Sequence, residues 1–516
     1  MHDPARKVNP WLIAAAVVLP AFMEVLDTTI VSVALNYIAG SLATSVTDAT
    51  WVSTSYLISN AVVLPASGWL AAYFGRKRYF IVSIVVFTVA SFFCGMAPSL
   101  GFLVLARIVQ GAGGGAMQPL SQAIIMEAFP PEKRGQAMAG WGLAVVVAPV
   151  LGPLLGGWIT YDYSWPWVFF INIPVGVLAI WLINRFISDP AYVRDAKPGK
   201  IDGIGFGLLT LWLATQQIVL DKGQDDDWFS ALWIRWFTAI SVVALIAFVI
   251  WEMKTDSPIV NLRILKNRNF AIGCVLGVLV GVVIYSPTTL LPLFVQNLLN
   301  YSSLQSGMAQ YTRGIGAVMV LPFVGMLSSR VDNRVFILVG LSLAGTASLM
   351  FGNITLQVAE TNFNLANFVQ GAGISMTFVP LATATMGLLR KEEMGNASGL
   401  FNLMRNLGGS IGISLATTLQ ERSALAHQAL LTKNLTPGNP VYEGALQSAQ
   451  AYLSTSVDAA QARLMAPGVI YQSLLQQANL FAFVDVFRLL ALVSFACILG
   501  VFAMKRVSAR GTVPMH

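Results

Sequence analysis

Four long stretches without a single Asp, Glu, Lys or Arg constrain this chain more than any other feature. They cover residues 79–106, 136–161, 269–312 and 361–389. Each is long enough for a helix of about 20 residues, the length that crosses a hydrocarbon core of roughly 30 Å. Only 11% of the 516 residues are charged, against roughly 25% in a soluble globular protein. The sequence therefore predicts an all-α integral membrane protein, because a membrane β-barrel would show short strands of alternating polarity.

The apolar runs divide the chain into about fourteen predicted transmembrane helices. The first run follows Arg6 and Lys7 and contains Glu24 and Asp27. Because it continues for about 26 residues without a clear small-residue cleavage site, we expect a retained helix and not a signal peptide.

The distribution of basic residues predicts the orientation of these helices. With the N-terminus inside, the predicted cytoplasmic segments hold about 22 of the 31 lysines and arginines, and the external segments hold about five. An even number of helices returns the C-terminus to the same side. We therefore expect a multi-pass membrane protein with both termini in the cytoplasm.

An internal repeat relates two parts of the chain at an offset of 260 residues. The motif Gln110-Gly111-Ala112-Gly113 recurs as Gln370-Gly371-Ala372-Gly373, and Gly152 recurs as Gly412. A repeat of about six helices in one orientation is typical of two-bundle transporters. We predict a six-helix bundle over 1–190, an inserted two-helix segment over 191–268 and a second six-helix bundle over 269–516. The second bundle contains an external loop at about 421–479 with two weakly helical stretches.

Charged residues inside the predicted helices are candidates for function. Each costs on the order of 2.5–3.5 kcal/mol at the bilayer centre, so the default interpretation is functional. Glu24 and Asp27 are three residues apart and share one helix face. Arg107 enters the membrane at a depth similar to that of Asp27, and Glu127 lies near the cytoplasmic end of the same helix. We assign proton coupling to these four residues, with two alternatives: Asp27 and Arg107 only hold two helices together, or Glu127 is an interfacial residue.

Motifs that follow in order along nearly the whole chain form two sets. The first set is Leu26-Asp27-Thr28-Thr29, Arg107 before Gln110-Gly111, Gly68 with Gly75-Arg76-Lys77-Arg78, and Gly152-Pro153 with Gly156-Gly157. The second set is Phe169-Phe170-Ile171-Asn172-Ile173-Pro174, Leu220-Asp221-Lys222-Gly223 and Arg405-Asn406-Leu407-Gly408-Gly409. The first set resembles the signature set of the major facilitator superfamily. The second set resembles its fourteen-helix drug:proton antiporter branch, in particular the EmrB-type multidrug exporters of Gram-negative inner membranes, and this resemblance implies a bacterial inner membrane as the location.

The resemblance implies a proton-coupled efflux transporter that exports hydrophobic or cationic compounds by alternating access. It also implies a periplasmic adaptor protein and an outer-membrane channel as partners, and the 421–479 loop is the candidate contact region. Two departures concern the pattern itself. The family has an acid followed by a base where this chain has Ala72 and Tyr73, and Asn36 replaces a proline. A cytoplasmic latch that uses that acid is therefore not expected here.

The motif Gly152-Pro153 with Gly156-Gly157 has a physical interpretation as well. Glycines allow another helix to approach closely in lipid, and proline removes a backbone donor and bends the helix. We assign these four residues, together with Gly75 and Arg76, to the conformational change. The alternative is ordinary helix packing.

The remaining predictions concern the substrate cavity and bound groups. Tyr285, Gln296 and Arg405 are candidates to line the cavity. We expect no cofactor beyond the proton gradient, since no Walker A string is present. We also expect no metal site and no nucleic-acid partner. A dedicated exporter of one metabolite or siderophore stays open as an alternative, and a membrane-embedded enzyme is a more distant one.

Overall fold

The structure is a computed structural model of the chain and consists of helices joined by short connections. It describes residues 9–189, 202–301, 303–328, 330–358, 360–390 and 393–505, and no strand occurs in these segments. The N-terminal helices are α1 (Pro10–Ser41), α2 (Val46–Ala49), α3 (Trp51–Phe74), α4 (Arg76–Gly95), α5 (Leu100–Gly114), α6 (Met117–Ala128), α7 (Pro131–Asp162), α8 (Trp167–Phe170) and α9 (Asn172–Phe186). Next come α11 (Gly203–Lys222) and α12 (Leu232–Lys254). The C-terminal helices are α13 (Arg268–Asn297), α14 (Ser303–Ala309), α15 (Tyr311–Leu327), α16 (Asn333–Phe351), α17 (Glu360–Met386), α18 (Met394–Thr432), α19 (Pro440–Leu453) and α20 (Ala459–Phe502).

The all-α membrane fold expected from the sequence is confirmed. Within the described residues, 11 helices are long and apolar enough to cross a membrane, or 12 if the bent helix α7 is included as one span. The shorter apolar helix α15 and the more polar α18 fall outside that count. The exact number of fourteen crossings therefore stays a prediction.

Polar side chains set where several helices begin. Asn9 accepts a hydrogen bond from the backbone of Trp11 at the start of α1, and Asp202 accepts one from Gly205 at the start of α11. Such caps satisfy the amide groups that have no partner in the first helical turn. They also place both helix starts outside the apolar runs.

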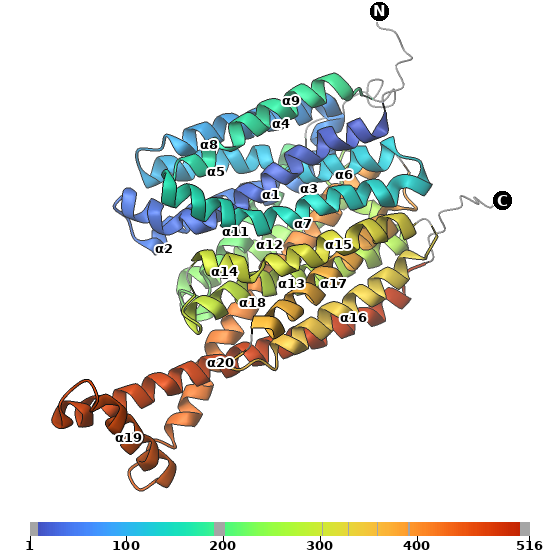
Figure 1. Cartoon of the computed structure of the whole chain (residues 1–516). Helices are drawn as coiled ribbons and strands as arrows, with labels where there is room; N and C mark the ends of the chain where they lie inside the picture. The colour runs from blue at the N-terminus through green and yellow to red at the C-terminus, as the bar shows by residue number, and fades with distance from the viewer. Residues whose placement is uncertain are drawn as a thin grey trace, which may run out of the picture.

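The helices α1 to α9 lie together above the helices α13 to α18 in Figure 1. Helix α1 begins and α20 ends on one side of the molecule, which we call the terminal end. The opposite side, where α19 lies, is the protruding end (Figure 1). Helices α11 and α12 pack on each other, and α11 also contacts α3 and α18.

The internal repeat is also a repeat of helix packing. A Cβ on Gly111 of α5 would collide with the backbone of Tyr56 in α3, and a Cβ on Gly371 of α17 would collide with Arg313 in α15. Gly152 of α7 packs on α1, and Gly412 of α18 packs on α13. Glycines at the 260-residue offset therefore bring together equivalent helix pairs, since only a missing side chain permits such close contact.

The segment 421–479, predicted as a loop with two weakly helical stretches, is more helical than the sequence indicated. Helix α18 continues to Thr432, α19 occupies Pro440–Leu453, and α20 already begins at Ala459. In Figure 1 the ends of α18 and α20 extend together beyond the other helices and carry α19 at their tip. The Gln, Ala and Ser residues that indicated a solvated connection also have fair helix propensity, so the two long helices simply continue.

The two sets of helices meet closely at the terminal end. Gly68 of α3 lies against the backbone of Gly395 in α18, so closely that a Cβ would be 2.6 Å from the Gly395 carbonyl carbon. Gly325 of α15 lies against Ala139 of α7, where the corresponding distance is 2.7 Å. The structure is therefore closed at the terminal end.

Candidate functional site

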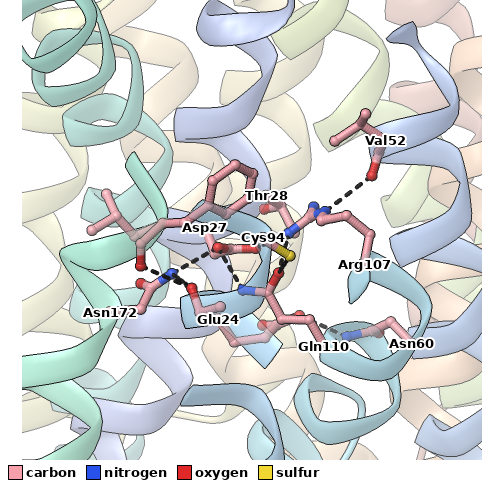
Figure 2. A network of polar contacts seen from close by, with 12 residues as sticks. Glu24, Asp27, Thr28, Val52, Asn60, Cys94, Arg107, Gln110 and Asn172 are labelled. Atoms are coloured by element: carbon pink, nitrogen blue, oxygen red, sulfur yellow. Dashed lines mark hydrogen bonds and ion pairs between the residues drawn. The ribbon is translucent and has the colours of Figure 1, made fainter. Parts of the chain in front are cut away.

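A buried ion pair between Asp27 of α1 and Arg107 of α5 lies among the N-terminal helices. The Arg107 Nη1 to Asp27 Oδ2 distance is 2.6 Å, and neither residue is more than 1% exposed. Asp27 Oδ1 also accepts hydrogen bonds from Gln110 Nε2 at 2.9 Å and from Asn172 Nδ2 at 2.8 Å (Figure 2). Every one of these donors points at the Asp27 carboxylate, so its charge is fully compensated.

Arg107 is held by more than its carboxylate partner. Its Nε donates to the carbonyl of Val52 at 3.0 Å, and its guanidinium lies 4.1 Å from the centre of the Tyr56 ring. The pairing expected from the similar depth of the two residues is thus present. Breaking it would leave a buried charge without its partner, which costs about 3–5 kcal/mol.

Glu24 lies one turn from Asp27 and has a different environment. It is 5% exposed, and its carboxylate accepts hydrogen bonds from two side-chain amides: Asn60 Nδ2 at 3.0 Å and Gln118 Nε2 at 2.6 Å. No ion pair involves Glu24 within the described part of the chain. Glu24 is therefore a buried carboxylate held by neutral donors, and Asp27 is one held by a cation.

Gln118 connects Glu24 to the C-terminal helices. While its Nε2 donates to Glu24, its Oε1 accepts a hydrogen bond from Arg405 Nη2 of α18 at 3.0 Å. Below it, Gln122 Oε1 accepts from Asn402 at 2.7 Å and from Ser398 at 3.1 Å. The helices α6 and α18 thus meet through a row of side-chain hydrogen bonds, and the row ends at Glu24.

Sequence reasoning missed both side-chain amides that hold Glu24, those of Asn60 and Gln118. Gln118 is part of the repeated segment, but its repeat equivalent is Phe378, so the comparison of the two copies did not mark it. Asn60 stands within an apolar helix with no motif around it. A buried amide in a predicted membrane helix was the available signal, because such groups need a partner there.

A cavity of about 110 Å³ lies between the two sets of helices. Of the predicted lining residues, Tyr285 of α13 lines it. Arg405 does not line it directly, but it contacts two residues that do, Gln118 and Phe378, the latter with its guanidinium 4.8 Å from the ring centre. Gln296 does not belong to the cavity: it is exposed in the last turn of α13, beyond Pro292. The sequence did not show where α13 ends, so the polar side chain of Gln296 was predicted to line a cavity inside the membrane. It lies instead in the last turn of the helix.

The cavity has a basic character that the sequence did not predict. Arg313 of α15 lines it and is 6% exposed. Its partners are neutral, namely Thr288 Oγ1 at 3.1 Å and Asn367 Oδ1 at 3.2 Å. Among the described residues, Arg313 Nε and both Arg405 Nε and Nη1 have no hydrogen-bond acceptor, and no carboxylate lines the cavity. Neither Glu24 nor Asp27 lines the cavity. In this arrangement, a substrate in the cavity would not contact these carboxylates directly.

Glu127, the fourth predicted proton-coupling residue, pairs with Arg76 at the terminal end. The two side chains make a double contact, with Nη1–Oε2 at 2.5 Å and Nη2–Oε1 at 2.9 Å. Gly75 just before Arg76 has a φ of 85°, a conformation that favours glycine. This ion pair joins α4 to α6 at the terminal end, close in sequence to Ala72 and Tyr73, and Glu127 lies far from the Asp27 network along the helix.

The glycine–proline motif lies on a bend of α7. The helix bends by 41° between the stretch ending at Pro149 and the stretch beginning at Leu151. Before the bend, α7 packs on the C-terminal helix α15; after it, Gly152 and Gly156 pack on Thr29 and Ile30 of α1. A Cβ on Gly157 would meet no atom within 4 Å, and Pro153 lines the cavity. The close contact expected of this motif is therefore with α1 in the same half, while Pro153 of the motif faces the cavity between the halves.

Comparison with known proteins places this architecture in a family. The family model of the Major Facilitator Superfamily matches residues 17–413. The chain is 35% identical to the "Multidrug export protein EmrB" of Escherichia coli strain K12, over 99% of this chain and 98% of that protein. It is 37% identical to the "Fatty acid resistance protein FarB" of Neisseria gonorrhoeae, over 84% of this chain and 85% of that one. Among solved structures, the proton:xylose symporter XylE has the same fold with a TM-score of 0.58 at 12% identity, covering 94% of each chain. The chain therefore belongs to the major facilitator superfamily of membrane transporters.

Proposed function

We propose that this protein is a proton-driven exporter of amphipathic drug-like compounds that works by alternating access in a bacterial inner membrane, with both termini in the cytoplasm. The hydrogen-bonded chain from Glu24 through Gln118 to Arg405 is the observation that carries the proposal. It joins a buried carboxylate of α1 to the contact between the two sets of helices. The proton gradient is the only energy source in this proposal, and no cofactor takes part.

The amide of Gln118 explains how one proton changes that contact. Protonating Glu24 Oε2 turns an acceptor into a hydroxyl donor, which faces the donating Nε2 of Gln118. If the amide turns over to accept from the new hydroxyl, its NH₂ group faces Arg405, which has donors only. The unturned amide loses its hydrogen bond to Glu24, between α6 and α1, whereas the turned amide loses the one from Arg405, between α6 and α18. When the amide turns, proton binding thus weakens the contact between α6 and α18, and proton release restores it.

The Asp27–Arg107 pair has a supporting role in this mechanism. Asp27 is compensated by Arg107, Gln110 and Asn172 at once. Its charge keeps α1, α5 and α9 in register, while Glu24 gains and loses the proton. Glu127 is proposed to stabilise the terminal end through Arg76, without carrying the transported proton.

The charges around the cavity favour organic anions among hydrophobic substrates. Arg313 lines the cavity, Arg405 lies just behind it, and both have buried N–H groups free for an acceptor. An acidic headgroup satisfies such donors, whereas a cation would be repelled. The name of the Neisseria relative refers to fatty acids, which are amphipathic carboxylic acids. The sequence indicated hydrophobic or cationic compounds, and the buried arginines favour the hydrophobic acid instead.

A periplasmic adaptor and an outer-membrane channel complete the proposed export system. The helices at the protruding end expose large apolar side chains, with Val441 81% exposed, Tyr452 76% and Leu464 83%. Such residues clustered beyond the membrane-spanning helices favour a protein partner. Photo-crosslinking from position 452 should capture a co-expressed adaptor, and the substitution Leu464→Glu should lower the yield. Full co-purification of the adaptor with a chain lacking 436–457 would assign the contact to another surface.

Vesicles with an imposed pH gradient test the proton site. The Glu24→Gln protein should insert and bind substrate but show no uphill transport and no substrate-induced proton release. Glu132→Gln, a change at an exposed carboxylate near the start of α7, is the matched control and should transport normally. Unchanged proton coupling in Glu24→Gln would exclude Glu24 as the proton carrier.

The same vesicles distinguish a multidrug exporter from a dedicated one. We expect several chemically unrelated hydrophobic acids to compete for transport. Transport of one metabolite or siderophore alone would favour the alternative of a dedicated exporter.

Accessibility tags test the orientation. Tags at both termini should be protected in intact cells, and a tag within 440–453 should be reached from outside.

A further inference from the structure

A second hollow lies away from the transport cavity, between the inserted helices and the C-terminal helices. Its volume is about 530 Å³, and its walls come from α11, α12 and α18, through Trp212, Phe248 and Leu403 among others. Two basic residues of the segment before α13, Arg263 and Lys266, stand at its edge. The hollow is thus apolar inside and basic at one end.

The depth of this pocket matches one leaflet of a bilayer. Trp212 lies nine residues from the start of α11, Leu245 nine residues from the end of α12, and Met404 ten residues from the start of α18. All three helix ends are at the terminal end. At 1.5 Å per residue the pocket reaches about 14–15 Å into the membrane, half of a hydrocarbon core of roughly 30 Å.

The pocket opens sideways, toward the lipid. Val249 is 36% exposed, Met253 59% and Leu265 36%, although each lines the pocket. A soluble compound would have to enter through the hydrocarbon, whereas a lipid is already there. The position and the opening therefore favour a phospholipid over a soluble amphiphile.

The basic residues at the edge select the headgroup. Lys266 and Arg263 are exposed, and neither forms an ion pair within the described segments. Arg263 Nη2 donates to the carbonyls of Met253 at 3.3 Å and Thr255 at 3.2 Å, which fixes the guanidinium at the rim. Basic pockets between membrane helices at the surface of a leaflet suit anionic lipid headgroups.

We propose that this pocket binds one anionic phospholipid from the leaflet at the terminal end. Its phosphate contacts Arg263 and Lys266, and an acyl chain lies along Trp212, Phe248 and Leu403. Leu403 and Met404 directly precede Arg405, the α18 residue that contacts Gln118. The bound lipid therefore fills the space between α12 and the part of α18 that meets the N-terminal helices.

Native mass spectrometry of the purified full-length chain, with phosphatidylglycerol and phosphatidylethanolamine added in turn, tests this site. The unchanged protein should retain one phosphatidylglycerol in preference to phosphatidylethanolamine. The double substitution Arg263→Gln with Lys266→Gln should weaken phosphatidylglycerol binding about 30-fold, because each basic residue near an anionic headgroup contributes about 1 kcal/mol and 1.4 kcal/mol is a factor of ten. Phosphatidylethanolamine binding should hardly change.

A matched control removes two charges at the same end of the molecule but away from the pocket. Arg78 and Arg185 are exposed on the N-terminal helices α4 and α9. Arg78→Gln with Arg185→Gln should retain the lipid. Val249→Phe should fill the pocket and lower the retention of both lipids while leaving the basic residues in place. Equal losses in the two double variants, or undiminished phosphatidylglycerol retention in the pocket variants, would overturn the proposal.

Discussion

The two halves of the repeat use the same positions for different chemistry. In the N-terminal half, Arg107 and Gln110 of α5 compensate the carboxylate of Asp27. At the 260-residue offset, Asn367 and Gln370 take their places in α17, Asn367 accepts from Arg313, and Gln370 Oε1 is buried without a partner among the described residues. One half therefore buries a neutralised ion pair with Glu24 beside it, and the other buries arginines without a carboxylate.

In the function that we propose, this difference separates two tasks, proton binding and substrate binding. A carboxylate is needed to carry a proton, and it is found in the N-terminal half. Donors without acceptors are needed to bind an anion, and they lie in the C-terminal half. Arg405 contacts both, since Gln118 and Phe378, its two neighbours, are themselves equivalent positions of the repeat. The two halves therefore share their helix packing but differ in their buried charges.

The largest effect is expected where the N-terminal half loses its charge balance. Asp27→Asn should destabilise the protein by about 3–5 kcal/mol, because it leaves Arg107 buried without its carboxylate. Thermal unfolding in detergent measures this. The double substitution Asp27→Asn with Arg107→Gln should recover much of the loss, and a double variant as unstable as the sum of the single ones would contradict the pairing.

A smaller effect is expected at the glycines that hold α7 against α1. In Gly156→Leu a Cβ would lie 2.9 Å from the Ile30 carbonyl oxygen, so the helices must separate. We expect about 1–3 kcal/mol of destabilisation from overpacking and loss of export with membrane insertion intact. Gly157→Leu is the matched control, since nothing lies within 4 Å of its Cβ position. Normal efflux by a well-expressed Gly156→Leu protein would reduce this motif to simple packing.

The arginine of the C-terminal half should affect substrate choice more than stability. Arg313→Gln removes the one charged residue lining the cavity within the described chain. We expect about a tenfold weaker apparent affinity for hydrophobic acids, a loss of about 1.4 kcal/mol, and little change for neutral analogues. Competition assays with matched acid and amide pairs measure the ratio. An equal loss for both members of each pair would mean that Arg313 only shapes the cavity.

The smallest effect on substrate preference is expected from placing an ion pair in the C-terminal half, as in the N-terminal half. Asn367→Asp places a carboxylate on Arg313, where the amide oxygen lies at 3.2 Å. The new ion pair should compensate the arginine and lower the preference for acids by about threefold, or roughly 0.7 kcal/mol, without loss of folded protein. The same acid and amide pairs provide the measurement, and a stronger preference for acids would refute the assigned role of Arg313.

Much of the fold and part of the site could be predicted from the sequence. The charge-free stretches predicted the membrane helices, because hydropathy depends on residues close together in the chain. The internal repeat predicted two copies of a unit of about six helices. The pairing of Asp27 with Arg107 was also accessible, since two opposite charges at one depth in a membrane have few other partners. Asn172 was recognised as part of a motif, but its contact with Asp27 could not be inferred.

The other contacts between distant helices were decided by the tertiary structure alone. The pairing of Arg76 with Glu127 depends on how α4 lies beside α6, and the place of Gln296 depends on where α13 ends. The connection of Glu24 to Arg405 through Gln118 requires three helices from both halves to meet at one point. Periodicity and hydropathy indicate which residues are buried, because burial is set along each helix. They do not indicate which buried polar groups face one another, because that depends on the rotation and depth of every helix in the bundle.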